Sequence, residues 1–331
     1  MAYKIADLVR WDKLFQTLAA RPRLATHVRR YIMSQRSEKP LGDWMVLPNL
    51  SNLMTIEWRY GLTINAVHRF IRSCPSRDIR SVLLPSWMPD HLPQAFWTWL
   101  ENQKNLRELK LPGSCNPSII PLDTIPKLEA LGASPNVARI LVPNRSIRAF
   151  DGIGYFYDTT SPTWSLEDLE YVLSHLRPGL QSIGRVKVSR QNVASFLRLI
   201  RKWCPFTKTI YCLIECQDIS VPDAPGAINL EDLVSALHGF QCLRNFYLTI
   251  DYKSTEEAVR EMIEEIAKDC PMLSFVKWTS TISSYDAGYP NEAYVFAYEF
   301  VGGLWSCVER PRDGKYPIVR ADEWVVDGRG S

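Results

Sequence analysis

The segment NLRELKL, residues 105–111, places leucines at i, i+3 and i+5, at Leu106, Leu109 and Leu111. The last two are two residues apart and therefore point to one face of a short strand, while the first enters from a turn. The same spacing of apolar residues recurs along the chain, and it predicts a repeated turn-and-strand unit with one inward side. The other copies begin at Leu53, Ile79, Ile183, Leu243 and Leu273.

A Cys-Pro pair stands between a helical pattern and a strand pattern at three places, with its cysteine at Cys74, Cys204 and Cys270. Upstream of each cysteine, the residues eight, seven and four positions earlier are apolar and share one helical stripe with it. The proline then ends the helix. We interpret the cysteine as the last apolar contact of each helix, a role that needs no reactivity.

The distance between units predicts the architecture. Units that start at Leu53, Ile79 and Leu106 are 26 and 27 residues apart, which is room for one strand, one helix and two turns. Such a unit cannot bury its own apolar face, so neighbouring units must stack. Strands joined through helices run parallel. We therefore predict an α/β solenoid over residues 47–280, with a curved parallel sheet and helices on its convex side.

The two ends differ from the repeats. Residues 1–46 are predicted to form a helical N-terminal lead, and residues 281–331 a β-rich C-terminal cap with a strand or hairpin. NEAYVFAYEF, residues 291–300, alternates cleanly and places Tyr294, Phe296, Tyr298 and Phe300 on one strand face. Because the open end of a solenoid needs covering, we interpret this aromatic row as core of the cap.

The pattern weakens between residues 112 and 163. Two apolar pairs remain, Leu128 with Leu131 and Val137 with Ile140. They predict two short strands that lie too close together in the sequence for a helix between them. The stretch DGIGYFYDTTSPTW, residues 151–164, is either a functional loop or a worn repeat. Ser165 then predicts the N-cap of a helix, since an aspartate follows three residues later.

Composition narrows the choice of partner and compartment. Of 331 residues, 46% are hydrophobic and 23% charged, as in soluble globular proteins. The formal net charge of +3 is too balanced to indicate a nucleic-acid or membrane-surface partner. We find no apolar run of about 18 residues and no signal-peptide pattern. We therefore expect a cytoplasmic or nuclear protein whose eight cysteines stay reduced.

Signals of enzyme chemistry are weak. Phosphate-loop, zinc-protease and serine-elbow motifs do not occur, and Gly152 and Gly154 lack the third glycine of a dinucleotide turn. Cys212 and Cys216 lie on a predicted strand about 13 Å apart, too far to share a zinc ion, although on a helix they would be close. We expect no catalytic, cofactor or metal site. The alternative is an α/β enzyme whose site lies in the Asp151–Trp164 loop, with a deep pocket and shifted pKa values.

These motifs carry a resemblance to a known family. NLRELKL and CLRNFYL, residues 242–248, resemble the L-x-x-L-x-L core of leucine-rich repeats, and helices ending in Cys-Pro resemble the cysteine-containing subtype of F-box substrate receptors. Residues 14–33 are similar to the segment that joins F-box and repeats in fungal proteins of that kind. The resemblance implies a substrate-receptor type of recognition array. Because only 20 residues precede Arg21, too few for an F-box, we expect no direct binding to the ligase adaptor.

A solenoid of this kind would bind on its concave sheet, where each strand presents two outward side chains, at i+2 and i+4. Arg, Tyr and Phe at such positions anchor protein interfaces, and Lys beside Glu adds charge complementarity. We therefore predict a protein partner on this face. The residues predicted to bind it are Glu57, Glu108, Lys110, Arg185, Lys187, Asn245, Tyr247, Phe275 and Lys277, and the remaining outward positions hold Thr55, Ser81 and Leu83.

Overall fold

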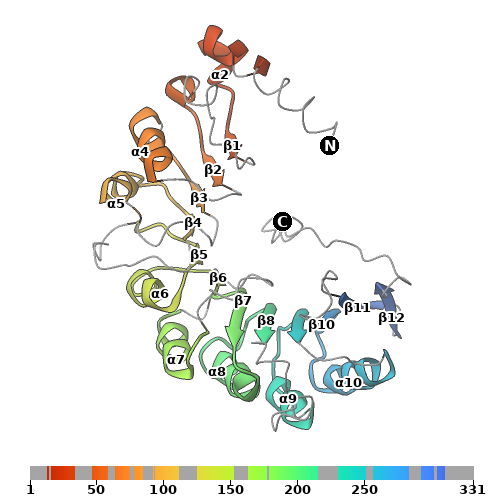
Figure 1. Ribbon diagram of the computed structural model, residues 1–331. Coiled ribbons are helices and arrows are strands. Elements are labelled where there is room, and N and C mark those ends of the chain that lie inside the picture. Colours follow the sequence, from red (N-terminus) through yellow and green to blue (C-terminus); the bar gives the residue numbers. More distant parts are fainter. Residues whose placement is uncertain are drawn as a thin grey trace.

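The computed structural model describes residues 13–14, 16–33, 47–58, 64–74, 78–84, 92, 94–111, 125–152, 163–176, 179–214, 230–250, 256–282, 292–301 and 304–309. Within these ranges, twelve strands form one sheet in which each strand pairs with the next along the chain. The strands line the inner side of an arc and the helices its outer side (Figure 1). The predicted α/β solenoid is therefore confirmed.

The strands are short, and those from β1 to β10 pair in parallel. They are β1 (Arg30–Met33), β2 (Thr55–Trp58), β3 (Ser81–Leu83), β4 (Glu108–Lys110), β5 (Ala130–Gly132), β6 (Ala149–Asp151), β7 (Ser182–Val188), β8 (Thr209–Ile214), β9 (Asn245–Ile250) and β10 (Phe275–Ile282). The last two, β11 (Glu292–Val301) and β12 (Leu304–Glu309), form an antiparallel hairpin against β10.

The helices after β1 connect strands and cover the convex side, and the short helix α2 precedes β1 (Figure 1). The helices are α2 (Pro22–Ala25), α4 (Ile64–Ser73), α5 (Gln94–Glu101), α6 (Pro135–Leu141), α7 (Leu166–His175), α8 (Val193–Trp203), α9 (Leu230–Leu237) and α10 (Glu256–Asp269), with 3-10 turns η1 (Leu47–Asn49) and η2 (Arg190–Asn192). Among the described residues, no helix is long and apolar enough to cross a membrane.

The repeated apolar positions form one continuous core between sheet and helices. Leu106, Leu109 and Leu111 are each fully buried, as are the equivalent residues of the units around β2, β3, β9 and β10. The helices contribute the stripes predicted upstream of the cysteines, for example Leu197 and Ile200 on α8. Each strand therefore buries one face and leaves the other directed to the inside of the arc.

A backbone ladder aligns the beginnings of the strands. The carbonyl of the residue before each strand from β1 to β9 accepts two amide hydrogen bonds from the next unit, and the first of each pair measures 2.7 to 2.9 Å. At one joint, the carbonyl of Arg80 accepts from the amides of Arg107 and Glu108. The residues before the strands are therefore held in line across the sheet.

The irregular region differs from its prediction in one respect. Val137 and Ile140 were predicted to form a strand, and that prediction is wrong, because both lie in helix α6. Pro135 stands in the first turn of α6, where its fixed φ favours a helix, and Val137 and Leu141 are buried on one stripe of it. The short connection between β5 and β6 therefore does hold a helix, of 7 residues.

The unit around β7 is also shifted from its prediction. Leu180, rather than Ile183, is the turn residue of this unit, because Ile183 pairs with the central apolar residue of β8. The register then shifts between Ile183 and Val186, and Arg185 in this bulge has a positive φ of 41°. A bulge of this kind adds an outward residue, so Gly184 and Arg185 are both half-buried, while Lys187 lies between the buried Val186 and Val188.

Both ends add strands to the sheet. At the N-terminal end, β1 lies within the segment predicted as a helical lead and pairs with β2. At the C-terminal end, Tyr298 of β11 is buried opposite Val276, as expected for core of a cap. Phe300 is 44% exposed and does not belong to that core. The side chains of Tyr294 and Phe296 lie outside the described residues.

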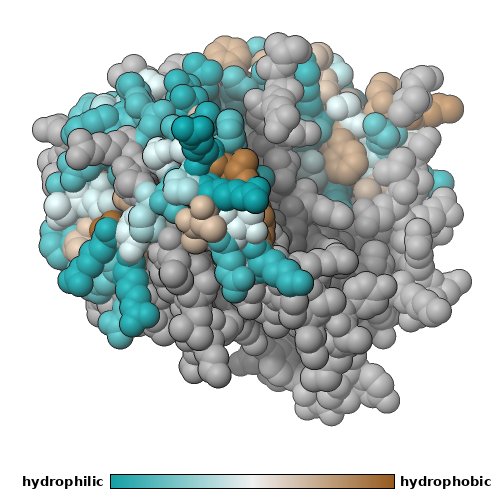
Figure 2. Space-filling model, turned by 90° about the horizontal axis from the view of Figure 1, so that it is seen from above, coloured by the Kyte–Doolittle hydropathy of each residue, from teal (hydrophilic) through white to brown (hydrophobic). Residues whose placement is uncertain are grey.

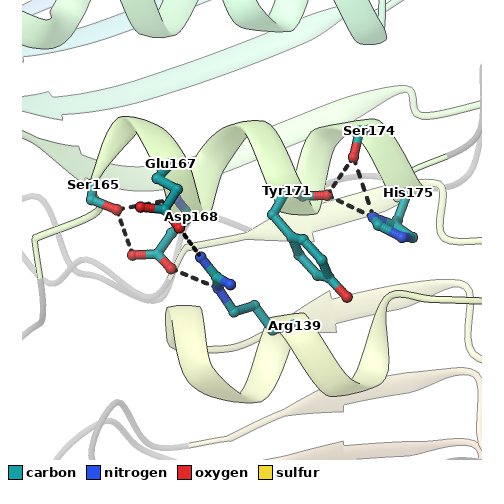
Figure 3. Close-up of polar contacts among 7 residues, drawn as sticks. All are labelled: Arg139, Ser165, Glu167, Asp168, Tyr171, Ser174 and His175. Carbon is teal, nitrogen blue, oxygen red and sulfur yellow. Dashed lines mark hydrogen bonds and ion pairs between the residues drawn. The ribbon is translucent and has the colours of Figure 1, made fainter.

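The convex surface carries contacts between consecutive helices (Figure 3). The predicted N-cap at Ser165 is confirmed, since its hydroxyl oxygen accepts from the Asp168 amide at 3.0 Å. Arg139 of α6 donates to the Asp168 carboxylate of α7 at 2.7 Å and lies 4.9 Å from the centre of the Tyr171 ring. The hydrogen bond to Asp168 raises the pKa of Arg139. One arginine thus links the cap of α7 to the helix before it.

Candidate protein-binding face

Two rows of side chains cross the concave side of the sheet, and strand register defines them. The first row comprises Thr55, Ser81, Glu108, Ala130, Ala149, Ser182, Thr209, Asn245 and Phe275. The second row comprises Glu57, Leu83, Lys110, Gly132, Asp151, Gly184, Tyr211, Tyr247 and Lys277. Most of these side chains are half-buried.

A charged cluster occupies the middle of the second row. The Asp151 carboxylate accepts from Nε of Arg185 at 3.1 Å, and a second guanidinium nitrogen of Arg185 pairs with its other oxygen. Nζ of Lys110 lies 3.7 Å from the same carboxylate. Two cations therefore converge on one anion, and their side chains are only 14% and 18% exposed. The charge-assisted hydrogen bonds from Arg185 and the ion pair with Lys110 hold the three groups in place.

Gly132, the register partner of Asp151 on β5, makes room for this convergence. Gly132 lies between Lys110 and Asp151 in register, and a Cβ on it would meet Cγ of Lys110 at 2.9 Å. Gly184 is the register partner of Asp151 on β7. The lysine side chain can therefore cross one strand and reach the carboxylate on the next.

Carboxylates in the N-terminal half of the face are engaged as well. Glu57 accepts from Arg30 of β1 at 2.5 Å. Glu108 accepts from the Ser81 hydroxyl at 2.6 Å. These contacts join neighbouring strands along the two rows and orient the carboxylates that were predicted to bind a partner.

Aromatic side chains gather in the C-terminal half. The ring centres of Tyr211 and Tyr247 are 5.8 Å apart, and those of Tyr247 and Phe275 are 5.4 Å apart. Burial raises the pKa of both tyrosines. Asn245 donates to the Thr209 hydroxyl at 3.2 Å beside them. This half of the face offers an apolar strip with hydroxyl groups.

All nine predicted residues lie on strands of the concave side, and the structure brings several of them together. Lys110 meets Arg185 at a shared carboxylate, and Tyr247 contacts Phe275. The sequence reasoning missed Asp151 and Tyr211, which complete the cluster and the aromatic strip. Their units were not recognised, although Phe150 before Asp151 and Ile210 before Tyr211 occupy the central apolar position.

The alternative enzyme site in the Asp151–Trp164 loop lies largely outside the residues that the structure describes, which exclude residues 153–162. At the two described ends of that loop, the Trp164 indole donates to the Gly152 carbonyl at 3.2 Å, and Asp151 belongs to the charged cluster. No group of three or more His, Cys, Asp or Glu side chains that could hold a metal occurs within the described ranges. Cys216 lies outside them, so the predicted cysteine pair stays untested.

Comparison with known proteins gives a structural likeness without a family match. A scan against protein-family models finds no match, and neither does a search of curated proteins. Among solved structures, the chain is similar to the leucine-rich repeat-containing protein LegL7 from Legionella pneumophila, with 13% identity and a TM-score of 0.37. That likeness covers 75% of this chain and 90% of the other. Similarity at this level says nothing about function.

Proposed function

We propose that the protein is a recognition module that binds a protein partner on its concave face. The observation that carries this proposal is that a three-membered charged cluster and an aromatic strip lie on the same concave surface of the sheet. Aromatic and arginine side chains supply most of the binding energy in protein interfaces. The sheet holds them on rigid elements, which lowers the entropic cost of binding.

The proposed partner presents both charge and apolar surface. Arg185 and Lys187 of β7 and Lys277 of β10 lie on the concave side, and Lys277 is the register partner of Tyr247. Cations of this kind favour a partner with acidic groups, and the aromatic strip favours apolar side chains between them. We propose that the protein does this work in the cytoplasm or nucleus.

A finer version of the proposal is a substrate-receptor role like that of F-box proteins with leucine-rich repeats. It is supported by the sequence likenesses around NLRELKL, CLRNFYL and residues 14–33. We propose that this role does not include direct docking to the ligase adaptor. Purified protein and adaptor should elute separately from a sizing column, whereas stoichiometric co-elution would show that an adaptor-binding segment is present.

Affinity capture with matched variants tests the concave face itself. The double variant Y247A/K277E changes an aromatic and a cationic residue of the second row. Its control, Y171A/K202E, makes the same two changes on the convex helices α7 and α8, where Tyr171 is half-buried and Lys202 is exposed. Proteins retained by the wild type and by the control, but lost with the concave variant, would be partners of this face. Equal retention by all three proteins would refute the proposal.

A further inference from the structure

A third row of side chains lies outside the two concave rows, at the beginnings of the strands. We define the basic rim as the residues immediately before strands β6 to β10, which are Arg148, Gln181, Lys208, Arg244 and Ser274. All five are exposed. The backbone ladder joins them in sequence, with amide-to-carbonyl distances of 2.7 to 2.9 Å, so their side chains are aligned at the separation of neighbouring strands.

The cations of the basic rim form no ion pair with another described residue. In the N-terminal half of the sheet, two of the equivalent arginines have acidic partners, since Arg107 pairs with Glu129 at 3.1 Å and Arg80 lies 3.8 Å from Asp78. The rim itself holds no carboxylate. Three exposed positive charges therefore lie in line over the four strands from β6 to β9.

Exposed apolar side chains accompany these charges. The described surface seen in Figure 2 is mainly hydrophilic, with small separate hydrophobic patches. Phe206 is 51% exposed and Met272 46% exposed, and each stands two residues before a rim residue, across a buried one. Phe300 lies at the same end of the sheet, since its amide donates to the Ser274 carbonyl at 2.9 Å. Phe206 and Met272 directly follow a Cys-Pro pair. The segment that ends each of these two helices therefore also exposes an apolar side chain.

We propose that the basic rim, with Phe206 and Met272, binds a short extended acidic segment of a partner protein that carries apolar side chains. Five strands span four separations of about 4.8 Å, or about 19 Å, which matches about six residues of extended chain. Alternating acidic and apolar residues would meet cations and exposed apolar side chains in turn. The presence of apolar anchors beside only three cations favours a polypeptide over a nucleic acid, whose binding depends on many phosphate contacts.

This surface is independent of the concave face. Its cations project from the residues before the strands, whereas the concave rows lie on the strands themselves. The two proposals can therefore fail separately, because variants of one surface leave the other unchanged.

A fluorescein-labelled peptide of alternating glutamate with leucine or phenylalanine is the probe, and its binding to the full chain is followed by fluorescence anisotropy. Two matched peptides replace every glutamate with glutamine or every apolar residue with serine. We expect the parent peptide to bind at least tenfold more tightly than either control, and its affinity to fall as salt is raised.

Variants locate the binding. K208E/R244E should weaken binding of the parent peptide about tenfold or more, and F206S should also weaken it, while neither should move the melting temperature because these side chains are exposed. R69E/R72E makes the same charge change on exposed arginines of helix α4 and should bind like the wild type.

Three outcomes would overturn the proposal. They are failure of the parent peptide to bind, equal binding by the wild type and K208E/R244E, and tighter binding of a single-stranded oligonucleotide that K208E/R244E abolishes. The last result would assign the rim to nucleic acid instead. Loss of binding in Y247A/K277E but not in the rim variants would show that the peptide uses the concave face.

Discussion

The cysteines of the Cys-Pro pairs join one repeat to the previous one. The thiol of Cys270 donates to the Leu237 carbonyl at 3.2 Å, and that of Cys204 lies 3.8 Å from the Leu173 carbonyl. Both carbonyls belong to the last turns of the preceding helices, where they have no partner within the helix. Burial raises the pKa of Cys204 to about 12 and that of Cys270 to about 11. Cys204 and Cys270 are therefore inert packing residues that also bond to the preceding repeat.

We predict slow reaction of these thiols with an alkylating reagent in the folded protein, because the thiolate is the reactive form. Cys74, Cys204 and Cys270 should label rapidly only after denaturation, while half-buried Cys242 provides an internal comparison in the native state. Mass spectrometry of labelled peptides gives the rates. Rapid native labelling of all three would contradict the packing role.

The same pKa shifts predict a pH dependence of stability. An unfolded thiol has a pKa of about 8.5, whereas the folded thiols at Cys204 and Cys270 ionise only near 12 and 11. Because the raised pKa keeps the proton in the folded state, the stability is fully present below about pH 8.5 and is lost as pH rises toward these values. Urea denaturation from pH 7 to 11 should show a decline that is smaller in Cys204→Ala. An unchanged decline would contradict this origin.

Truncating neighbouring strand residues to alanine should lower the free energy of unfolding by different amounts. Phe246 and Trp278 are buried in the core, so truncating either to alanine should cost about 3 to 5 kcal/mol of unfolding free energy through the cavity left behind. Phe275 is half-buried on the concave face, and Phe275→Ala should cost about 1 kcal/mol. Chemical denaturation measures the difference. Reversed costs would mean that the register is displaced by one residue.

At the scale of elements, the bulge in β7 sets a tight contact with β6. Gly152 occupies the third apolar position of its unit, and a Cβ there would lie 2.9 Å from Cα of Val186 and 3.1 Å from Nε1 of Trp164. The amide of Gly152 also donates to the Gly184 carbonyl at 2.8 Å. A backbone atom cannot move aside as a flexible side chain can, so the glycine is needed for this close approach.

Gly152→Ala should therefore lower the free energy of unfolding by about 1 to 3 kcal/mol, as overpacking does in a close-packed core. Gly179→Ala is the matched control, since nothing lies within 4 Å of its added Cβ. Both variants are compared by urea denaturation. Similar stability for the two would show that β7 does not approach β6 as described.

Sequence predicted those elements whose three apolar positions hold large residues. Leu106, Leu109 and Leu111 define β4 directly, and the units of β2, β3, β9 and β10 follow the same pattern. The units of β6 and β8 were not recognised because Gly152 and Thr207 stand where the other units have a large apolar residue. Each of the two makes a local contact that the spacing of apolar residues does not reveal. The bulge at Arg185 hid the register of β7 in the same way. The approach of Lys110 and Arg185 to Asp151 depends on the units that were not recognised, so it could not be predicted from the sequence.

At the scale of the molecule, a net charge of +3 conceals how charge is distributed. The concave face gathers cations around one carboxylate and places aromatic rings beside them, while the basic rim lines up three further cations. A balanced total therefore coexists with two surfaces that carry clustered cations, and we propose that both bind acidic partners. Stacking in chain order produces both, since equivalent positions of successive units lie side by side.

Site-specific photocrosslinking tests recognition on the concave face most directly. A photoreactive benzoyl-phenylalanine placed at Glu108 or at Lys277 faces the inside of the arc, and the same residue at exposed Glu261 of α10 faces outward. In cells that make the protein, irradiation should give discrete larger adducts from the two concave positions and none from the convex one. Adducts from Glu261 alone, or from none of the three positions, would contradict binding on the concave face.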